Sequence, residues 1–127
     1  MSFLIDTHVF IWYATGDKRL GKNAISIIEG NNEIYLSIAS LWEMAIKVNI
    51  GRLEFKEPFE KIATQQIAIN NYKILNIKPE HAFHLSHLEL FHKDPFDRII
   101  ISQATIEDMP LISKDRFFKD YNIEIIW

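Results

Sequence analysis

The sequence predicts an α/β fold in which helices flank a mainly parallel central sheet. Segments with the pattern of strands alternate with segments that have the pattern of helices, as in proteins built from strand–helix–strand units. Each expected strand is almost entirely apolar, which is typical of parallel strands buried on both faces. With 127 residues the chain is long enough for one core and too short for two ordinary domains. We therefore expect a single three-layer domain covering residues 1–127.

The first half of the chain should contain two strands and three helices. The short apolar run SFLI is typical of a buried strand, Gly16-Asp17 marks a loop, and Gly30-Asn31-Asn32 ends a helix. A later helix should stop near Gly51. The expected elements are a strand at 2–5, a helix at 7–14, a helix at about 21–29, a strand at 33–36 and a helix at 37–48.

The second half continues the alternation with three further helices, three strands and a short helix near the end. Prolines and apolar runs separate these segments. The expected elements are a helix at 58–70, a strand at 73–77, a helix at 79–88, a loop at 90–93, a helix at 95–107, a strand at 110–113, a short helix from about 116 to 120 and a strand at 124–126.

Composition narrows the functional classes. A formal net charge of -3 argues against a protein that holds nucleic acid by bulk positive charge alone, although local basic patches can still bind phosphate. The chain has no cysteine, so disulfides and thiolate metal sites are excluded. Its N-terminus lacks the basic region of a signal peptide, and no apolar stretch approaches the length of a membrane span. We expect a soluble, cytoplasmic protein that does not bind membranes.

The stretch HKDPFDRIIISQA has two interpretations. As a helix start it needs only local physics: Asp94 is the N-cap, Pro95 occupies N1, where its missing N–H is no loss, and Asp97 lies near the positive end of the helix dipole. The second interpretation makes Asp97 part of a metal site as well. This motif alone does not distinguish the two.

Four acidic residues should converge at one edge of the sheet. Ligands of open parallel sheets bind outside the carboxyl ends of the strands, near the point where strand order reverses. Asp6 ends the first expected strand, and Asp115 follows the strand at 110–113. Glu43 and Asp97 lie in the first turns of helices that start at the same edge.

Each acid also has a purely structural explanation. Asp6 and Asp115 can cap the helices that follow them, Ser40 and Glu43 fit a capping box, and Glu43 can pair with Lys47. Four carboxylates at one edge are explained poorly in this way, because they repel one another and are stable mainly around a cation. Oxygen ligands without cysteine favour Mg²⁺ or Mn²⁺, which suits phosphodiester hydrolysis.

Several motifs together resemble a known family. LIDTH at the first strand, SxxSxWE, HxDPFDR, ISKD, Tyr121 and the terminal IW occur in the order found in PIN-domain ribonucleases, and the chain is similar to the VapC-like toxins of type II toxin–antitoxin systems. The resemblance implies a PIN-like fold and a Mg²⁺- or Mn²⁺-dependent endoribonuclease that acts on RNA. It also implies a cognate VapB-like antitoxin and a homodimer. The residues that match the family's catalytic, metal-binding quartet are Asp6, Glu43, Asp97 and Asp115. His8 departs from the pattern, since many members carry serine or asparagine there.

Other residues are secondary candidates. Trp12 and Trp42 suit an antitoxin groove if they are partly exposed, although core packing is the default for both. His81, His84 and His87 are more simply explained as ordinary helix residues than as a zinc site. The candidates for contacts to RNA phosphates are Lys47, His92, Arg98 and Lys114, with Arg52, Lys93 and Arg116 also near the expected edge.

Three alternatives remain open. A receiver-type signalling domain would need an acidic neighbour for Asp6, and an aspartyl phosphotransferase would need an Asp where His8 stands. A catalytically inactive PIN fold used only for binding is the third, and the presence of all four acids argues against it.

Overall fold

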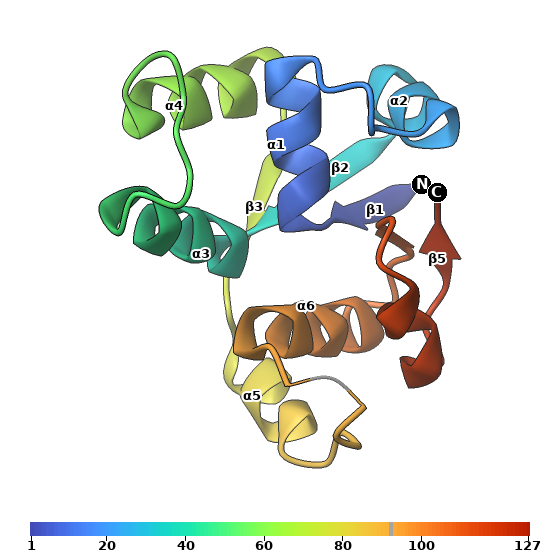
Figure 1. The fold of residues 1–127 in the computed structure, drawn as a ribbon. Helices are drawn as coiled ribbons and strands as arrows, with labels where there is room; N and C mark the ends of the chain where they lie inside the picture. The colour runs from blue at the N-terminus through green and yellow to red at the C-terminus, as the bar shows by residue number, and fades with distance from the viewer. Residues whose placement is uncertain (92) are drawn as a thin grey trace.

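Five parallel strands form the central sheet, in the order β3-β2-β1-β4-β5 (Figure 1). The computed structural model describes residues 1–91 and 93–127. Each pairing between neighbouring strands of this order is parallel. The strands are β1 (Ser2–Ile5), β2 (Glu33–Ser37), β3 (Lys73–Leu75), β4 (Leu111–Ile112) and β5 (Ile125–Ile126). The predicted α/β fold with a mainly parallel sheet is thus confirmed.

The helices occupy the segments where the sequence predicts them, with small shifts at their ends. They are α1 (Thr7–Thr15), α2 (Lys22–Glu29), α3 (Ile38–Asn49), α4 (Phe59–Ile69), α5 (Pro79–Leu85), α6 (Pro95–Ile106) and the 3₁₀ helix η1 (Arg116–Tyr121). Across the residues that the structure describes, no helix is both long and apolar enough to span a bilayer.

Several predicted elements are shorter in the structure, among them the strand expected at 110–113, which is reduced to Leu111–Ile112. For two others the hydrogen bonds show the reason. The strand expected at 73–77 ends at Leu75, because its partner β2 ends at Ser37, which is opposite Leu75. The helix expected at 79–88 ends at Leu85, because the next backbone N–H groups bond to carbonyls three residues back, in the manner of turns.

The alternation of side chains along the strands creates two cores, one on each face of the sheet. Phe3 and Ile5 of β1 pack with residues of α1, α2, α3 and α4. Leu4 between them points to the other face and packs with residues of α6 and η1. Figure 1 shows the same three layers, with α1, α2 and α4 on one side of the sheet and α5 and α6 on the other. The predicted three-layer arrangement is therefore confirmed.

A buried histidine joins α5 to α6. His81 is fully buried, and its Nδ1 accepts a hydrogen bond from the backbone N–H of Lys78 at 2.9 Å. Its other nitrogen, Nε2, must then carry the proton that it donates to Glu107 Oε2, also at 2.9 Å. Lys78 Nζ lies 3.4 Å from the same carboxylate oxygen. His81 thus has a structural role, consistent with its exclusion as a zinc ligand.

We expect Glu107→Gln to lower the melting temperature at neutral pH and to lose this effect in acid. The hydrogen bond from His81 and the nearby Lys78 hold the pKa of Glu107 below its ordinary value of 4.5. A carboxyl whose pKa is depressed on folding stabilises the protein above its unfolded pKa, and this contribution is lost as pH falls through the folded pKa. Melting curves of both proteins between pH 7 and pH 4 test this. A difference in melting temperature that does not narrow below about pH 4.5 would contradict it.

Candidate active site

Asp6 lies at the centre of the carboxyl edge of the sheet. It follows β1 directly and is the N-cap of α1, where its Oδ1 accepts the backbone N–H of Val9 at 2.9 Å. The sheet order places β2 on one side of β1 and β4 on the other, so strand order reverses between β1 and β4. Asp6 therefore stands at the switch point where open parallel sheets bind their ligands.

Ser113 connects Asp6 to Asp115. The backbone N–H of Asp6 bonds to the carbonyl of Ile112, which brings the residues after β1 and β4 together. Ser113 Oγ donates to Asp6 Oδ2, and the same oxygen accepts the backbone N–H of Asp115 at 3.0 Å. Asp115 in turn caps η1, because its Oδ1 accepts the N–H of Phe117 at 2.9 Å. One hydroxyl thus fixes the relative position of two candidate metal ligands.

The carboxyl group of Asp6 is almost completely buried, and this changes its pKa. Only 4% of its surface is exposed, and this burial raises the pKa of Asp6 above its ordinary value. The hydrogen bonds from Ser113 and Val9 and the nearby His8 lower the pKa, while the negative charge of Asp115 raises it further. A cation would stabilise the charged form of this group, since opposite charge favours ionisation.

Glu43 is hydrogen-bonded to Thr7, the residue that follows Asp6. Thr7 donates its hydroxyl proton to Glu43 Oε1 at 2.7 Å, and Ser40 Oγ lies 2.9 Å from the same Thr7 oxygen. Because a carboxylate only accepts, the Ser40 hydroxyl must serve as the donor to Thr7. Glu43 is 5% exposed, and its Oε2 forms an ion pair with Lys47 Nζ at 2.8 Å. The predicted pair with Lys47 is confirmed.

The suggested capping box of Ser40 and Glu43 is wrong. The N-cap of α3 is Ser37, whose Oγ accepts the backbone N–H of Ala39 at 3.0 Å. Ser37 is also the last residue of β2, so the strand passes into the helix without a loop. Glu43 consequently lies in the second turn of α3, and its place beside Thr7 has no explanation in helix capping.

Asp97 lies in the first turn of α6, on the opposite side of the edge from α1. The N-cap is Asp94, whose Oδ1 accepts the N–H groups of Phe96 at 2.9 Å and Asp97 at 3.1 Å, as predicted. The Phe96 ring meets the Trp42 ring edge to face, with centroids 5.0 Å apart. This contact sets the start of α6 against α3 beside Glu43.

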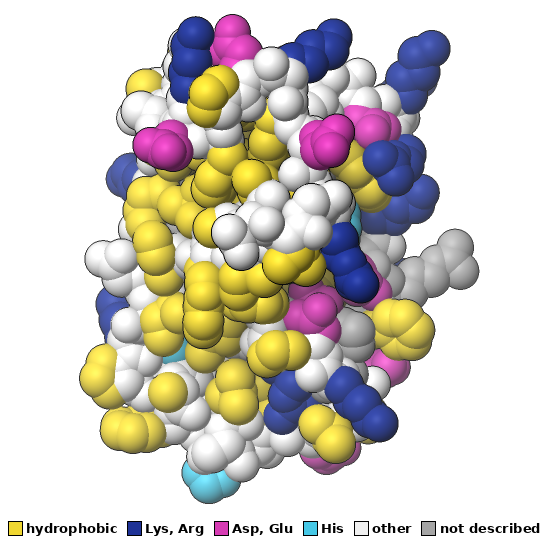
Figure 2. Space-filling view, turned by 60° about the vertical axis from the view of Figure 1, so that its left-hand side comes forward, with side chains coloured by type: hydrophobic (Ala, Val, Ile, Leu, Met, Phe, Trp, Pro, Cys, Tyr) yellow, Lys and Arg dark blue, Asp and Glu magenta, His cyan; other side chains and the backbone are white. Residues whose placement is uncertain are grey.

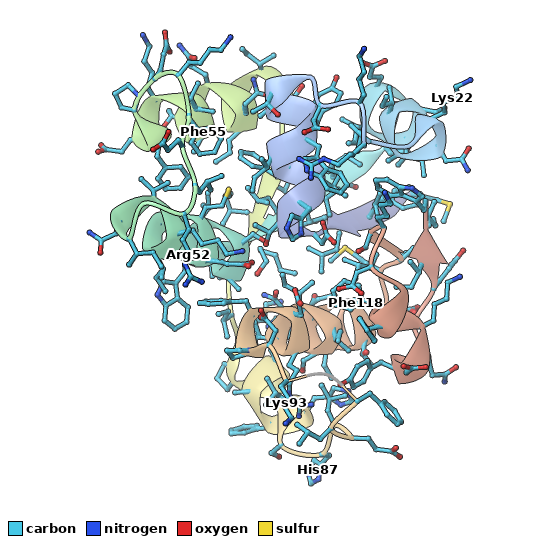
Figure 3. All side chains as sticks on the ribbon, viewed as in Figure 1. Lys22, Arg52, Phe55, His87, Lys93 and Phe118 are labelled. Carbon is cyan, nitrogen blue, oxygen red and sulfur yellow. The ribbon has the colours of Figure 1, made fainter. Side chains whose placement is uncertain are left out.

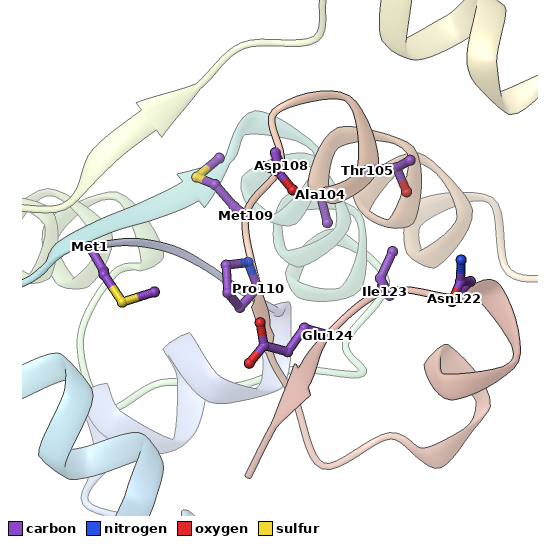
Figure 4. A pocket seen from close by; sticks show the side chains of 9 residues that line it. All are labelled: Met1, Ala104, Thr105, Asp108, Met109, Pro110, Asn122, Ile123 and Glu124. Atoms are coloured by element: carbon purple, nitrogen blue, oxygen red, sulfur yellow. The ribbon is translucent and has the colours of Figure 1, made fainter.

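A cavity of about 660 Å³ opens beside Asp6 and Asp115. Its lining also includes His8 and Trp12 of α1, together with Arg19, Lys114 and Phe117. A second cavity, of about 360 Å³, lies at the amino-terminal ends of β1, β4 and β5 and is shown in Figure 4. Its lining contains Asp108 and Glu124 but no lysine or arginine, so it offers no attraction for phosphate.

The four predicted acids are brought together only in part. Asp6 and Asp115 share a cavity and a hydroxyl bridge, and Glu43 bonds to the residue next to Asp6. Asp97 follows Phe96, whose ring contacts Trp42, the residue before Glu43. Among residues 1–91 and 93–127, no three His, Cys, Asp or Glu side chains stand close enough to hold a metal ion together.

The candidate phosphate contacts differ in their surroundings. Lys114 is exposed at the cavity, whereas Lys47 is committed to Glu43. Arg98 donates to the carbonyl of Glu89 at 3.0 Å and thereby ties the loop before α6 to the helix. Arg52, near α3, and Lys93, in the loop before α6, are exposed (Figure 3). His92 lies outside the described residues.

The two tryptophans have opposite environments. Trp42 is 58% exposed on α3, as a partner anchor requires. Trp12 is 8% exposed and packs edge to face on Trp127, with ring centroids 5.9 Å apart. Trp12 is therefore a core residue that also lines the cavity, which confirms the default of core packing and leaves Trp42 as the candidate anchor.

Three hydroxyl residues complete the site, and the sequence predicted this role for none of them, because Ser40 was expected only to cap a helix. Ser113 bridges two acids, Thr7 orients Glu43, and Ser40 supports Thr7. The available signal was position, because Thr7 and Ser113 each lie within two residues of an acid at the carboxyl end of a central strand. The bond between Thr7 and Glu43 spans 36 residues, a pairing that sequence spacing does not reveal.

Comparison with known proteins gives one consistent result. A family model described as PIN domain matches residues 3–124. Ribonuclease VapC22 from Mycobacterium tuberculosis is 27% identical over 119 residues, which are 93% of this chain and 90% of that protein.

Solved structures share the fold at lower identity. A chain of VapBC2 from Rickettsia felis, bound to a DNA fragment from its promoter, has a TM-score of 0.74 and 17% identity, with 99% of this chain and 98% of that chain covered. A chain of VapBC-1 from nontypeable Haemophilus influenzae has a TM-score of 0.70 and 15% identity, with coverage of 99% and 97%.

Ser113→Ala should destabilise the metal-free protein by about 1–3 kcal/mol, because it leaves a buried carboxylate oxygen of Asp6 without its donor. In the Asp6→Asn background the same Ser113→Ala change should cost less, since the charged oxygen that needs the hydroxyl donor is then absent. Urea unfolding in the presence of EDTA measures all four proteins. Additive losses of unfolding free energy would show that the bridge does not stabilise Asp6.

Proposed function

Because the chain belongs to the PIN domain family, we propose that it is a metal-dependent endoribonuclease, the toxin of a toxin–antitoxin pair. The observation that carries the proposal is the buried Asp6, joined through Ser113 to Asp115 at a cavity on the carboxyl edge of the sheet. Its reaction is hydrolysis of RNA phosphodiester bonds. The similar protein from Mycobacterium tuberculosis is named a ribonuclease, which supports this reaction.

The donor set suits Mg²⁺ or Mn²⁺. Asp6, Glu43, Asp97 and Asp115 offer only carboxylate oxygens, and burial disfavours the charge of Asp6 until a cation compensates it. Mg²⁺ keeps several waters and binds directly through one or two carboxylates, so the four acids need not all touch the ion. When bound, the ion supplies Lewis-acid activation of the attacking water and neutralises charge at the phosphate.

The surrounding residues hold these carboxylates in place. Val9 and Ser113 fix both oxygens of Asp6, and Thr7 fixes one oxygen of Glu43. Lys47 neutralises Glu43 while no cation is bound, which relieves repulsion among the acids. Lys114, exposed at the cavity, is placed to attract an RNA phosphate. A protein that cleaves cellular RNA acts in the cytoplasm, and we place it there.

An exposed apolar stripe on α3 suits the antitoxin. Ile38, Trp42, Ile46 and Ile50 follow one another at intervals of four residues, and each is between 37% and 58% exposed. The first three lie along one side of α3, since residues four apart are neighbours on a helix, and Ile50 is the C-cap that follows them. Figure 2 brings forward the side that carries α3 and α4 and shows hydrophobic side chains gathered across it. An exposed patch of this kind is typical of a protein interface.

The cognate VapB-like antitoxin binds this stripe by apolar contacts and places a basic side chain among the acids, in competition with the metal. The complex contains a homodimer of the toxin. Two solved structures with the same fold are complexes named VapBC, which supports a partner of this class.

One observation favours a second candidate, a PIN fold that binds without catalysis. Within the described residues, no three potential ligands stand close enough to hold a metal jointly. A metal-dependent nuclease needs the ion to complete the site formed by the four acids, whereas a protein that only binds does not. The next experiment separates the two.

Asp6→Asn, Glu43→Gln, Asp97→Asn and Asp115→Asn should each reduce RNA cleavage by at least about 100-fold, because each removes a charge that would hold the metal. The melting temperatures of the three aspartate variants without metal should not fall, since losing one of several repelling carboxylates eases the apo fold. Glu43→Gln also loses the ion pair with Lys47, so it should stay folded but melt at a lower temperature. Cleavage of an RNA substrate with Mg²⁺ or Mn²⁺ and thermal melting measure the two effects.

Asp94→Ser is the matched control for Asp97→Asn. Serine is as good an N-cap as aspartate, so this variant should keep the start of α6 and most of the activity. Activity at the level of the unmodified protein in any two of the four acid variants would refute the catalytic site, and no cleavage by the unmodified protein would favour the binding module.

Expression of the protein alone should arrest growth, and co-expression of the neighbouring antitoxin gene should relieve the arrest. Trp42→Ala should weaken the purified complex by at least about tenfold, because exposed tryptophans at interfaces often carry much of the binding energy. Phe83→Ala, which removes a 68% exposed ring from α5, serves as the control and should bind normally. Unchanged affinity of the Trp42→Ala variant would exclude the α3 stripe as the antitoxin surface.

A further inference from the structure

We propose that the cavity beside Asp6 and Asp115 is a stacking subsite for one unpaired nucleobase of the RNA, next to the phosphate that is cleaved. The proposal rests on the ribonuclease function and adds to it a position at which the substrate is read. It gives a role to His8, the residue that departs from the family pattern, and to Arg19 and Phe117, which the catalytic site does not use.

The first wall of the cavity is built by α1. His8 and Trp12 are one helical turn apart and therefore share a face of the helix. Their ring centroids lie 5.6 Å apart, with the planes tilted by 43°. Trp12 is buried and fixed against Trp127, whereas His8 is exposed at the cavity. The wall thus consists of an anchored ring that supports an exposed one.

Arg19 adds a second flat surface. Its guanidinium carbon lies 4.8 Å from the centre of the Trp12 ring. Two bonds to Asp17 hold it there, from Nε to Oδ1 at 3.1 Å and from Nη2 to Oδ2 at 2.8 Å. A guanidinium fixed in this way loses little freedom on binding and can stack on a base.

A further part of the lining comes from η1. Phe117 is 59% exposed and lines the cavity, and Lys114 lies beside it. The backbone N–H of Phe117 bonds to Asp115 Oδ1, so the position of this ring is tied to a candidate metal ligand. A base stacked here would be held at a fixed distance from the carboxylates, which is what alignment of a particular phosphate requires.

The lining favours a base over other occupants. The cavity, of about 660 Å³, is lined by an imidazole, an indole, a phenyl ring and the guanidinium plane of Arg19, and Lys114 adds a second cationic side chain beside the two carboxylates. Single-stranded nucleic acids are bound by this combination, because every base has a face that can stack while the backbone phosphates contact the cations. Stacking also explains how a protein with a net charge of -3 can hold RNA without a large basic surface.

A cycle that combines protein variants with modified RNA tests the proposal. His8→Ala and Phe117→Ala should each lower kcat/KM for a cleavable RNA at least about fivefold, the equivalent of losing one stacking contact. An RNA that lacks the base at one position flanking the cleavage site should be cleaved more slowly by the unmodified protein. On that RNA the two variants should show no further loss, because the ring and the base remove the same contact.

Two control sets separate stacking from folding. His8→Phe and Phe117→Tyr keep a ring and should restore cleavage of the intact RNA. Phe83→Ala, on α5, should have no effect. If the losses of kcat/KM from the variant and from the missing base add on every base-free RNA, the proposal is wrong. It is also wrong if the variants lower antitoxin affinity while RNA cleavage stays normal, since the occupant would then be a partner side chain.

A binding measurement tests the subsite independently of RNA cleavage. In the Asp97→Asn protein, an RNA with 2-aminopurine at the stacked position should lose fluorescence on binding, and His8→Ala should abolish this quenching. If the unmodified protein cleaves no RNA but quenching depends on His8, the nuclease function fails and the subsite survives. If cleavage occurs and no position is quenched, the subsite fails and the nuclease function survives.

Discussion

The carboxyl group of Asp6 must be accommodated in a place where water scarcely reaches it. It stands at the end of the central strand β1, 4% exposed, and burial alone would favour its neutral form. Val9 N–H and Ser113 Oγ satisfy one oxygen each, and these two bonds come from α1 and from the end of β4. The position of α1 and the approach of Asp115 both follow from satisfying this buried group.

The two-core architecture brings the other acids to the same edge. Glu43 comes from α3, which packs against both α1 and α6, and Asp97 comes from α6 on the other face of the sheet. The starts of α1 and α6 carry the positive ends of their helix dipoles, which partly offset the charges of Asp6 and Asp97. Hydrogen bonds through Thr7 and Ser113 then determine where these carboxylates point.

Sequence patterns predicted the strand–helix alternation, the parallel sheet and the helix start at Asp94 because these depend on local periodicity and capping. They failed where a tertiary contact decides. Ser40 has the local signature of an N-cap, yet it lies inside α3 and supports Thr7, since β2 passes directly into the helix at Ser37. The strand at 73–77 is shortened by the length of its partner. Trp12 and Trp42 both lie in helices that follow a strand, and only the tertiary packing, which buries Trp12 in the core cluster beside Trp127, separates them.

Diffraction from crystals of the protein soaked in Mn²⁺, measured at the manganese absorption edge, tests the central claim most directly. We expect an anomalous peak in contact with a carboxylate oxygen of Asp6 or Asp115, absent from crystals of the Asp6→Asn variant. Glu43 and Asp97 should then face the ion directly or through water. A peak only elsewhere on the protein, or none at Mn²⁺ concentrations that support RNA cleavage, would contradict a metal site built on Asp6.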